Sequence, residues 1–281
     1  MEPIVLSYLQ AKGLLQARQA GQEAATVSLD LGLTASEVAT EPAGVRLPDG
    51  QSLAWQDVEA IHAAQRSCFV IREDSAHKIQ LFSSATNRLY SLMPTQGAPT
   101  MLVSGVPMHR IKGTNPHRDT LAKIKTVAPV VGRVLDTATG LGYTAIEAAK
   151  TAEQVITIEL DPAALEVARL NPWSQALFND PKITQLVGDS FEVIQQFEDE
   201  AFSRIIHDPP TFSLAGDLYS GQFYRQLFRV LSSRGRLFHY IGDLNSKSGR
   251  NVVRGAVRRL QEAGFSRVVR RSQAFGLVAY K

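Results

Sequence analysis

An acid and two prolines close an apolar run in the second half of the chain. Residues 204–213 read RIIHDPPTFS, so Asp208, Pro209 and Pro210 directly follow a run typical of a buried strand. Because proline cannot donate to a β ladder, the pair should end the strand and fix the backbone. The Asp208 carboxylate and the Pro209 carbonyl could then accept hydrogen bonds from an amino group, and Phe212 could stack on a planar ring. The alternative is a strand-ending turn in which Asp208 caps a helix.

A glycine-rich turn follows another apolar run and precedes a helical pattern. Gly140 and Gly142 would let a ligand approach the backbone at the start of that helix. Asp136 ends the preceding run and could reach an ammonium group across the turn. By itself the turn also satisfies the dinucleotide pattern G-x-G-x-x-A, so a nicotinamide or flavin enzyme is an alternative.

Two further acids end the next two apolar runs. Glu159 lies about 20 residues after Asp136, a spacing typical of an acid that binds ribose hydroxyls. Asp189, followed by Ser190, could accept a hydrogen bond from the amino group of an adenine. Each acid alone is equally typical of a helix cap or a solvated loop. Their position at three successive strand ends favours a nucleoside ligand.

The elements that would position these residues alternate from residue 132 onward. β-branched runs and helical patterns follow one another, which predicts βαβ units and a parallel sheet. The expected strands are 132–138, 154–160, 183–189, 203–208 and 236–242, and the expected helices are 144–152, 162–170, 191–197, 221–231 and 251–264. Two last strands, 266–271 and 277–281, are joined too closely for a parallel crossover and should form an antiparallel hairpin.

The first hundred residues show a different pattern. A helix is expected over 5–20 and another over 55–65, among short strand-like runs separated by turn residues. We therefore expect a β-rich N-terminal domain over 1–108, a linker and first helix of the catalytic domain over 109–131, and a cofactor-binding catalytic domain over 132–281.

The segment from about residue 112 to the end resembles the class I S-adenosylmethionine-dependent methyltransferases. Their acid and alternating glycines appear as Asp136-x-Ala138-x-Gly140-x-Gly142, with alanine in place of the first glycine. The resemblance implies a Rossmann-like, mostly parallel sheet with an antiparallel C-terminal hairpin, and S-adenosylmethionine as cofactor. The residues it implies for cofactor binding are Asp136, Thr137, Ala138, Gly140 and Gly142 for the methionine part, Glu159 and Leu160 near the ribose, Asp189 and Ser190 near the adenine, and Asp208.

The Asp-Pro-Pro element resembles that of methyltransferases that modify exocyclic amino groups, with Thr211 inserted before the aromatic Phe212. It is similar to the DPPTFS element of some ribosomal RNA methyltransferases. Formation of 5-methylcytosine normally needs a cysteine nucleophile, and the only cysteine is Cys68, outside this domain. The resemblance therefore implies methyl transfer to a nitrogen of RNA or of another amine-bearing acceptor, with Asp208, Pro209, Pro210 and Phe212 as catalytic residues.

The order of a small β domain and then the cofactor domain resembles spermidine synthases and a group of predicted archaeal-type methyltransferases. Those synthases transfer an aminopropyl group from decarboxylated S-adenosylmethionine. Ser104 and Met108 replace the aspartate and glutamine of their Leu-Asp-Gly-x-x-Gln segment. Aminopropyl transfer to a polyamine is thus the first alternative function, and a non-catalytic cofactor-binding module is the second.

The acceptor is less well indicated. His109, Lys112, His117 and Thr211 are candidate substrate residues because they lie in the linker or beside the prolines. The C-terminal segment is rich in cations and could bind RNA phosphates, or it could be a solvated face. Its cations are Lys247, Arg250, Arg254, Arg258, Arg259, Arg267, Arg270, Arg271 and Lys281.

Composition bounds these hypotheses. The 281 residues are 44% hydrophobic and 20% charged, with a formal net charge of +3. No window has the roughly 18 apolar residues that a membrane span needs, so we expect no membrane partner. A single cysteine and no signal-peptide pattern favour a cytoplasmic protein. No His/Cys cluster has metal-ligand spacing, so no metal is predicted; a homo-oligomer is compatible with the sequence.

Overall fold

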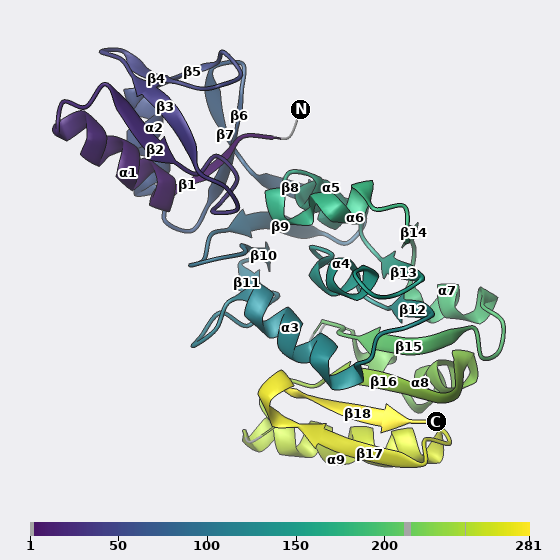
Figure 1. Ribbon diagram of the computed structural model, residues 1–281. Coiled ribbons are helices and arrows are strands. Elements are labelled where there is room, and N and C mark those ends of the chain that lie inside the picture. Colours follow the sequence, from purple (N-terminus) through teal and green to yellow (C-terminus); the bar gives the residue numbers. More distant parts are fainter. Residues whose placement is uncertain (1–2, 211–214, 245) are drawn as a thin grey trace. The chain divides into compact units, whose positions relative to one another are not determined.

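The computed structural model describes residues 3–210, 215–244 and 246–281 (Figure 1). The chain divides into two compact units, one made of Met1–His117 with Ala163–Gln175 and the other of Arg118–Pro162 with Ala176–Lys281. Within these described ranges, no helix is long and apolar enough to cross a lipid bilayer.

The first unit is built from short strands and two helices. They are β1 (Val5–Ser7), α1 (Tyr8–Gln19), β2 (Ala24–Val27), β3 (Ser36–Thr40), β4 (Gly44–Arg46), β5 (Ser52–Ala54), α2 (Trp55–Ala63), β6 (Cys68–Arg72), β7 (Ser75–Lys78), β8 (Gln80–Ser83), β9 (Arg88–Met93), β10 (Thr100–Val103) and β11 (Val106–Pro107). The strands form three antiparallel sheets, ordered β1-β6-β7, β2-β3-β4-β5 and β11-β10-β9-β8. Most of α5 (Pro162–Arg169) and the 3₁₀ turn η1 (Pro172–Ser174) also belong to this unit.

The expected helix over 5–20 begins later than predicted. Val5 to Ser7 pair with β6 as the strand β1, and the helix α1 starts only at Tyr8. Ser7 caps it through a reciprocal pair of hydrogen bonds with Gln10, which is the capping-box arrangement. The apolar residues before the cap continue the periodic pattern, and this made the strand look like the first turn of the helix.

The second unit is an α/β fold. Its elements are α3 (Pro116–Val127, of which residues 118–127 belong here), β12 (Arg133–Asp136), α4 (Tyr143–Ala149), β13 (Gln154–Glu159), α6 (Gln175–Asn179), β14 (Ile183–Val187), α7 (Ser190–Val193), η2 (Ile194–Gln196), β15 (Phe202–His207), η3 (Gly216–Tyr219), α8 (Gly221–Val230), β16 (Leu231–Tyr240), α9 (Lys247–Glu262), β17 (Arg267–Arg271), η4 (Ser272–Ala274) and β18 (Gly276–Tyr280).

Seven strands form one sheet in the order β14-β13-β12-β15-β16-β18-β17 (Figure 1). The first five strands are parallel to one another, whereas β18 is antiparallel to both β16 and β17. This confirms the predicted mostly parallel sheet and its antiparallel C-terminal hairpin. The fifth strand of the sequence prediction, β16, starts earlier than expected, at Leu231. Leu231 pairs with Phe202 of β15, and a register shift separates this pair from the rest of the ladder.

One apolar core lies between the sheet and helices α8 and α9. Phe223 and Leu227 of α8 and Leu260 of α9 are fully buried against Leu237 and Leu277 of the sheet. The buried positions of α8 recur every three to four residues, so this amphipathic face explains why the helix packs there. This packing fixes the sheet, and with it the carboxyl ends of its parallel strands.

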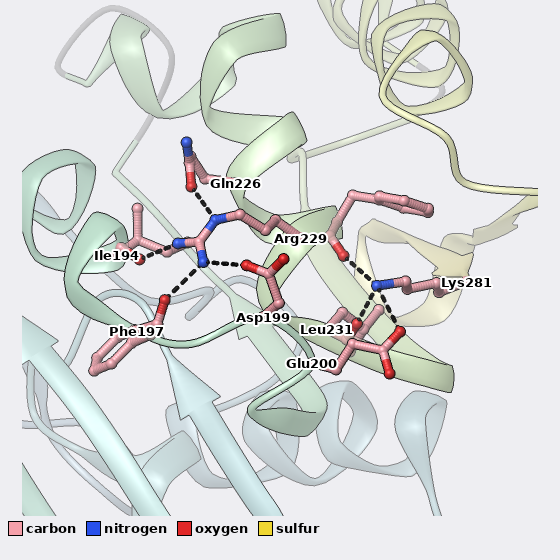
Figure 2. A network of polar contacts seen from close by, with 9 residues as sticks. Ile194, Phe197, Asp199, Glu200, Gln226, Arg229, Leu231 and Lys281 are labelled. Carbon is pink, nitrogen blue, oxygen red and sulfur yellow. Dashed lines mark hydrogen bonds and ion pairs between the residues drawn. The ribbon is translucent and has the colours of Figure 1, made fainter.

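Two cations of this unit make their hydrogen bonds and ion pairs with other groups of the protein (Figure 2). Arg229 of α8 donates to the carbonyls of Ile194 and Phe197 at 2.9 and 2.7 Å and contacts Asp199 at 2.7 Å. Lys281 donates to the carbonyls of Phe228 and Leu231, and its ammonium lies 3.2 Å from Glu200 (Figure 2). Lys281 is therefore bound within the protein, although its charge was counted with the basic C-terminal segment.

We expect Arg229→Ala to lower the free energy of unfolding by about 1–3 kcal/mol, because the carbonyls of Ile194 and Phe197 lose their hydrogen-bond donor. Urea unfolding of the full chain measures the change. Arg225→Ala is the matched control, since Arg225 lies on the same helix with an exposed side chain and should change stability by less than about 0.5 kcal/mol. Equal losses in the two variants would contradict the role of this network.

Candidate active site

Two carboxylates meet where the strand order of the second unit reverses direction. β12 is central and pairs with β13 on one side and β15 on the other, so a crevice is expected outside their carboxyl ends. Asp136 is the last residue of β12, and Asp208 directly follows β15. The two side chains are close enough that the charge of Asp208 helps to raise the pKa of Asp136.

Asp136 is completely buried and only half satisfied. Its Oδ2 accepts hydrogen bonds from the hydroxyls of Thr144 at 3.0 Å and Thr157 at 3.1 Å. Its Oδ1 has no hydrogen-bond partner within the described part of the chain. Burial raises the pKa of this carboxyl to about 7. A buried oxygen without a donor is costly, so the site is suited to a ligand that brings a positively charged donor.

The glycine turn after β12 has the conformation that its sequence predicts. Gly140 and Gly142 have φ of +53° and +76°, and a Cβ on Gly142 would lie 2.6 Å from the side chain of Leu177. The Gly140 N–H donates to Glu159 Oε2 at 2.8 Å, and the Asp161 N–H donates to the other carboxylate oxygen. Burial raises the pKa of Glu159, whereas these two backbone donors oppose the shift. Glu159 is thus held against the turn.

The remaining predicted nucleoside residues surround the ends of β13 and β14. Leu160 and Val187 are apolar but 52% and 56% exposed, so they offer surface for a flat ring. Asp189 is exposed and caps α7 by accepting from the Phe191 N–H at 2.8 Å. The Ser190 hydroxyl is buried and donates to the Thr137 carbonyl at 2.6 Å, so it holds the turn rather than facing a ligand.

Thr137 and His207 face the opposite side of the sheet from Asp208. The Thr137 hydroxyl lies 2.7 Å from His207 Nδ1, and His207 Nε2 lies 2.9 Å from the Leu218 carbonyl. The ring of His239 is 4.4 Å from that of His207, centroid to centroid. Burial lowers the pKa of His207 to about 3, so this cluster is neutral. As expected from strand alternation, His207 supports the site from behind.

The proline pair is held by a buried tyrosine. The Tyr219 hydroxyl donates to the Pro210 carbonyl at 3.1 Å, and the Tyr219 side chain is only 2% exposed. Pro209 is buried and Asp208 is partly exposed. The turn therefore presents the Asp208 carboxylate from a braced backbone.

A lysine that the sequence analysis did not single out pairs with Asp208. The Lys123 ammonium lies 2.6 Å from Asp208 Oδ2 and 2.9 Å from Asp119 Oδ2, and its side chain is 3% exposed. The spacing of Asp119 and Lys123, four residues apart on α3, could have predicted their ion pair. Nothing in the sequence indicates that Asp208 is the third member.

The predicted substrate residues that the structure describes all belong to the first unit. His109 and His117 belong to the first unit, where His109 Nδ1 lies 3.0 Å from the Thr100 hydroxyl and the ring of His117 packs against that of Trp173. Lys112 is exposed in the same unit. Thr211 and Phe212 lie outside the described residues, so their roles stay predictions.

Most arginines of the basic C-terminal segment lie on α9 and β17. Arg254 and Arg258 are exposed one helical turn apart, and Arg258 lies 3.5 Å from Glu262. Arg267 and Arg270 are exposed on β17, and the Arg267 guanidinium lies over the ring of Tyr280. RNA binding by this face stays a prediction.

The residues at the carboxyl edge suit a nucleoside with a cationic group. Asp136 Oδ1 could receive an ammonium, Glu159 could accept from ribose hydroxyls, and Leu160 could contact a base. The seven-stranded order, with β18 antiparallel to its neighbours, defines the class: a Rossmann-like fold of the class I methyltransferase and spermidine synthase type.

Comparisons with known proteins place the chain more closely. Residues 126–249 match the family model of the spermine/spermidine synthase domain. A crystal structure of spermidine synthase in complex with the transition-state analogue AdoDATO aligns with a TM-score of 0.59 and 18% identity, over 72% of this chain and 71% of that one. At this identity the likeness shows the fold.

The chain belongs to the same family as the uncharacterized protein MJ1233 of Methanocaldococcus jannaschii. The two are 39% identical over 284 residues, which cover 99% of this chain and 96% of the archaeal protein. Putrescine N-methyltransferase 2 of Nicotiana tabacum is also similar, with 25% identity over 162 residues, 56% of this chain and 43% of the plant enzyme. Spermidine synthase-like enzymes, including a methyltransferase, are therefore among its relatives.

Proposed function

We propose that this protein is an S-adenosylmethionine-dependent methyltransferase that transfers the methyl group to a nitrogen of RNA or of another amine-bearing acceptor. The observation that carries the proposal is the pair of acids at adjacent strand ends. Asp136 is buried, and one of its oxygens, which has no donor among the residues that the structure describes, is suited to the cofactor's ammonium. Asp208 lies within electrostatic range of Asp136 on a braced Asp-Pro-Pro turn. The similarity to a putrescine N-methyltransferase supports nitrogen as the acceptor atom.

The cofactor would supply an electrophilic methyl group on a sulfonium. The acceptor nitrogen would form a bond to the methyl carbon as the carbon–sulfur bond breaks, and the sulfur would keep the electron pair. Asp208 and the Pro209 carbonyl would accept hydrogen bonds from the acceptor N–H groups and thereby aim the nitrogen lone pair. The methylated nitrogen would then lose a proton to Asp208 or to water.

Aminopropyl transfer is the second candidate, because the matching family model is that of spermine/spermidine synthases. Such an acceptor carries further ammonium groups, which acidic side chains would have to bind. The Lys123 ammonium already pairs with Asp208 at 2.6 Å, so this carboxylate is less available to a further ammonium group. This contact favours methyl transfer to an uncharged amino group.

Calorimetric titration of the full chain separates the candidates. We expect binding of S-adenosylmethionine and S-adenosylhomocysteine to be tighter than that of decarboxylated S-adenosylmethionine, with no binding of NAD. A preference for the decarboxylated compound would instead support aminopropyl transfer. Labelled methyl transfer into the RNA, protein and small-molecule fractions of a cell extract would then identify the acceptor class, whereas binding without any transfer would indicate a non-catalytic module.

The raised pKa of Asp136 predicts how cofactor binding depends on pH. Pairing with an ammonium favours the ionised carboxyl, so below pH 7 binding must release the proton that the free protein holds. We expect affinity for S-adenosylmethionine to rise about fivefold from pH 6 to pH 7 and about tenfold in all by pH 8, where it levels off. Calorimetry in buffers of different ionisation enthalpy should show nearly one proton released at pH 6 and few at pH 8. Asp136→Asn should remove this proton release; its persistence would assign the proton to another group.

A further inference from the structure

Lys123 is a buried cation that contacts Asp208, and none of the sequence motifs accounts for it. We propose that Lys123 is a positioning residue that keeps Asp208 ionised and fixes the direction of its carboxylate. This inference rests on the proposed methyltransferase function and adds a residue to it. Lys123 engages Asp208 Oδ2, which leaves Asp208 Oδ1 to accept a hydrogen bond from the acceptor nitrogen.

The surroundings of Lys123 hold its ammonium in one place. Asp119 and Asp208 contact it at 2.9 and 2.6 Å, and the ring of Tyr240 lies 4.6 Å from it, a distance typical of a cation–π contact. Burial alone would lower the pKa of Lys123, but the two carboxylates raise it above its ordinary value. Lys123 therefore stays charged, and its stem, which is only 3% exposed, has little room to move.

Asp208 needs such a partner because of where it lies. Burial raises its pKa, Lys123 lowers it, and the charge of Asp119 raises it again. Asp136 on β12 is a further acid whose pKa responds to Asp208, and the phenol of Tyr219 on η3 is also in range of its charge. Lys123 is thus the cation that opposes proton uptake by Asp208 among these groups.

Without that cation, Asp208 would take up a proton more readily and would then also act as a hydrogen-bond donor. An ionised carboxylate only accepts hydrogen bonds, whereas a protonated carboxyl also donates one. A donor at this position would compete for the acceptor's lone pair, which must point at the methyl carbon. The ion pair therefore links a residue on α3 to the orientation of the nucleophile.

The test compares Lys123→Met with Asp119→Asn. Both variants remove one contact of the same cluster, but they change the charge near Asp208 in opposite directions. We expect the acidic limb of the pH–rate profile for methyl transfer to move up by about 1–3 pH units in Lys123→Met. In Asp119→Asn it should stay or move down, because a neighbouring negative charge is lost. Cofactor affinity at pH 8 should remain within about threefold in both variants.

Carbon-13 NMR of the aspartate carboxyls provides a readout that does not need turnover. The Asp208 signal, assigned by comparison with Asp208→Asn, should titrate at higher pH in Lys123→Met than in the unmodified protein. An unchanged titration, or an unchanged acidic limb in an active enzyme, would overturn the proposal. Absence of methyl transfer in the unmodified protein would instead contradict the proposed function, and the NMR titration would still decide whether Lys123 controls Asp208.

Two further variants protect the test from misfolding. Lys123→Met combined with Asp119→Asn removes one cation and one acid together, so it leaves fewer unpaired charges, and it should still show the upward shift. Lys123→Arg retains the charge and should keep the original acidic limb, with a lower rate if the geometry of the pair matters. An upward shift in Lys123→Arg equal to that in Lys123→Met would contradict a role for the charge.

Discussion

Asp208→Ala is expected to lower methyl transfer by about a thousandfold or more, while the dissociation constant for S-adenosylmethionine stays within about tenfold. The variant removes the carboxylate proposed to orient the acceptor nitrogen. It leaves Asp136 and Glu159, the acids proposed to hold the cofactor, in their places. Labelled methyl transfer measures the first quantity, and calorimetry of the same preparation measures the second.

Asp217→Ala serves as the control for charge. Asp217 is exposed on η3, close to Asp208 in the chain, and its loss changes the net charge equally. We expect transfer within about twofold of the unmodified protein in that variant. If Asp208→Ala weakened cofactor binding a hundredfold instead, Asp208 would belong to the cofactor site and the assigned role would be wrong.

Gly140→Val is expected to raise the dissociation constant for S-adenosylmethionine by at least about a hundredfold. A branched side chain on the turn after β12 would fill the space into which the cofactor approaches the backbone. Valine also disfavours the positive φ of +53° at this residue, so part of the effect could come from a strained turn. Calorimetric titration measures the affinity.

Gly132→Val separates strain from obstruction. Gly132 has a similar φ of +65° but precedes β12, at the opposite end of the strand. Valine there imposes similar backbone strain at a distance from the proposed cofactor. We expect comparable loss of thermal stability in both variants, yet affinity within about threefold only in Gly132→Val. Equal loss of affinity would sink the placement of the cofactor at the glycine turn.

Much of the second unit could be predicted because its signals are local. A strand buried on both faces appears as an apolar run, and an acid or a glycine pair at the end of that run marks the carboxyl edge. The order of Asp136, Glu159 and Asp208 along the chain thus indicated which residues could share a crevice. The short connection before β18 likewise required an antiparallel strand.

Parts of the first unit were less predictable. Strands β3, β5 and β7 are short and contain few β-branched or aromatic residues, so their pairing depends on their neighbours rather than on their own propensity. The sequence pattern placed β1 within a helix because the apolar periodicity does not show that the helix begins only after the Ser7 cap. Long-range pairing with β6 decides its structure.

The sequence by itself determined the fold class and the acids at the strand ends, since both follow from patterns within a few residues. Only the tertiary structure decided how those acids are charged and satisfied. Among the described residues, the hydroxyls of Thr144 and Thr157 both reach one oxygen of Asp136 and leave the other without a donor. Lys123 on α3 reaches Asp208, 85 residues away in the chain, only through the fold, and no local pattern encodes such a contact.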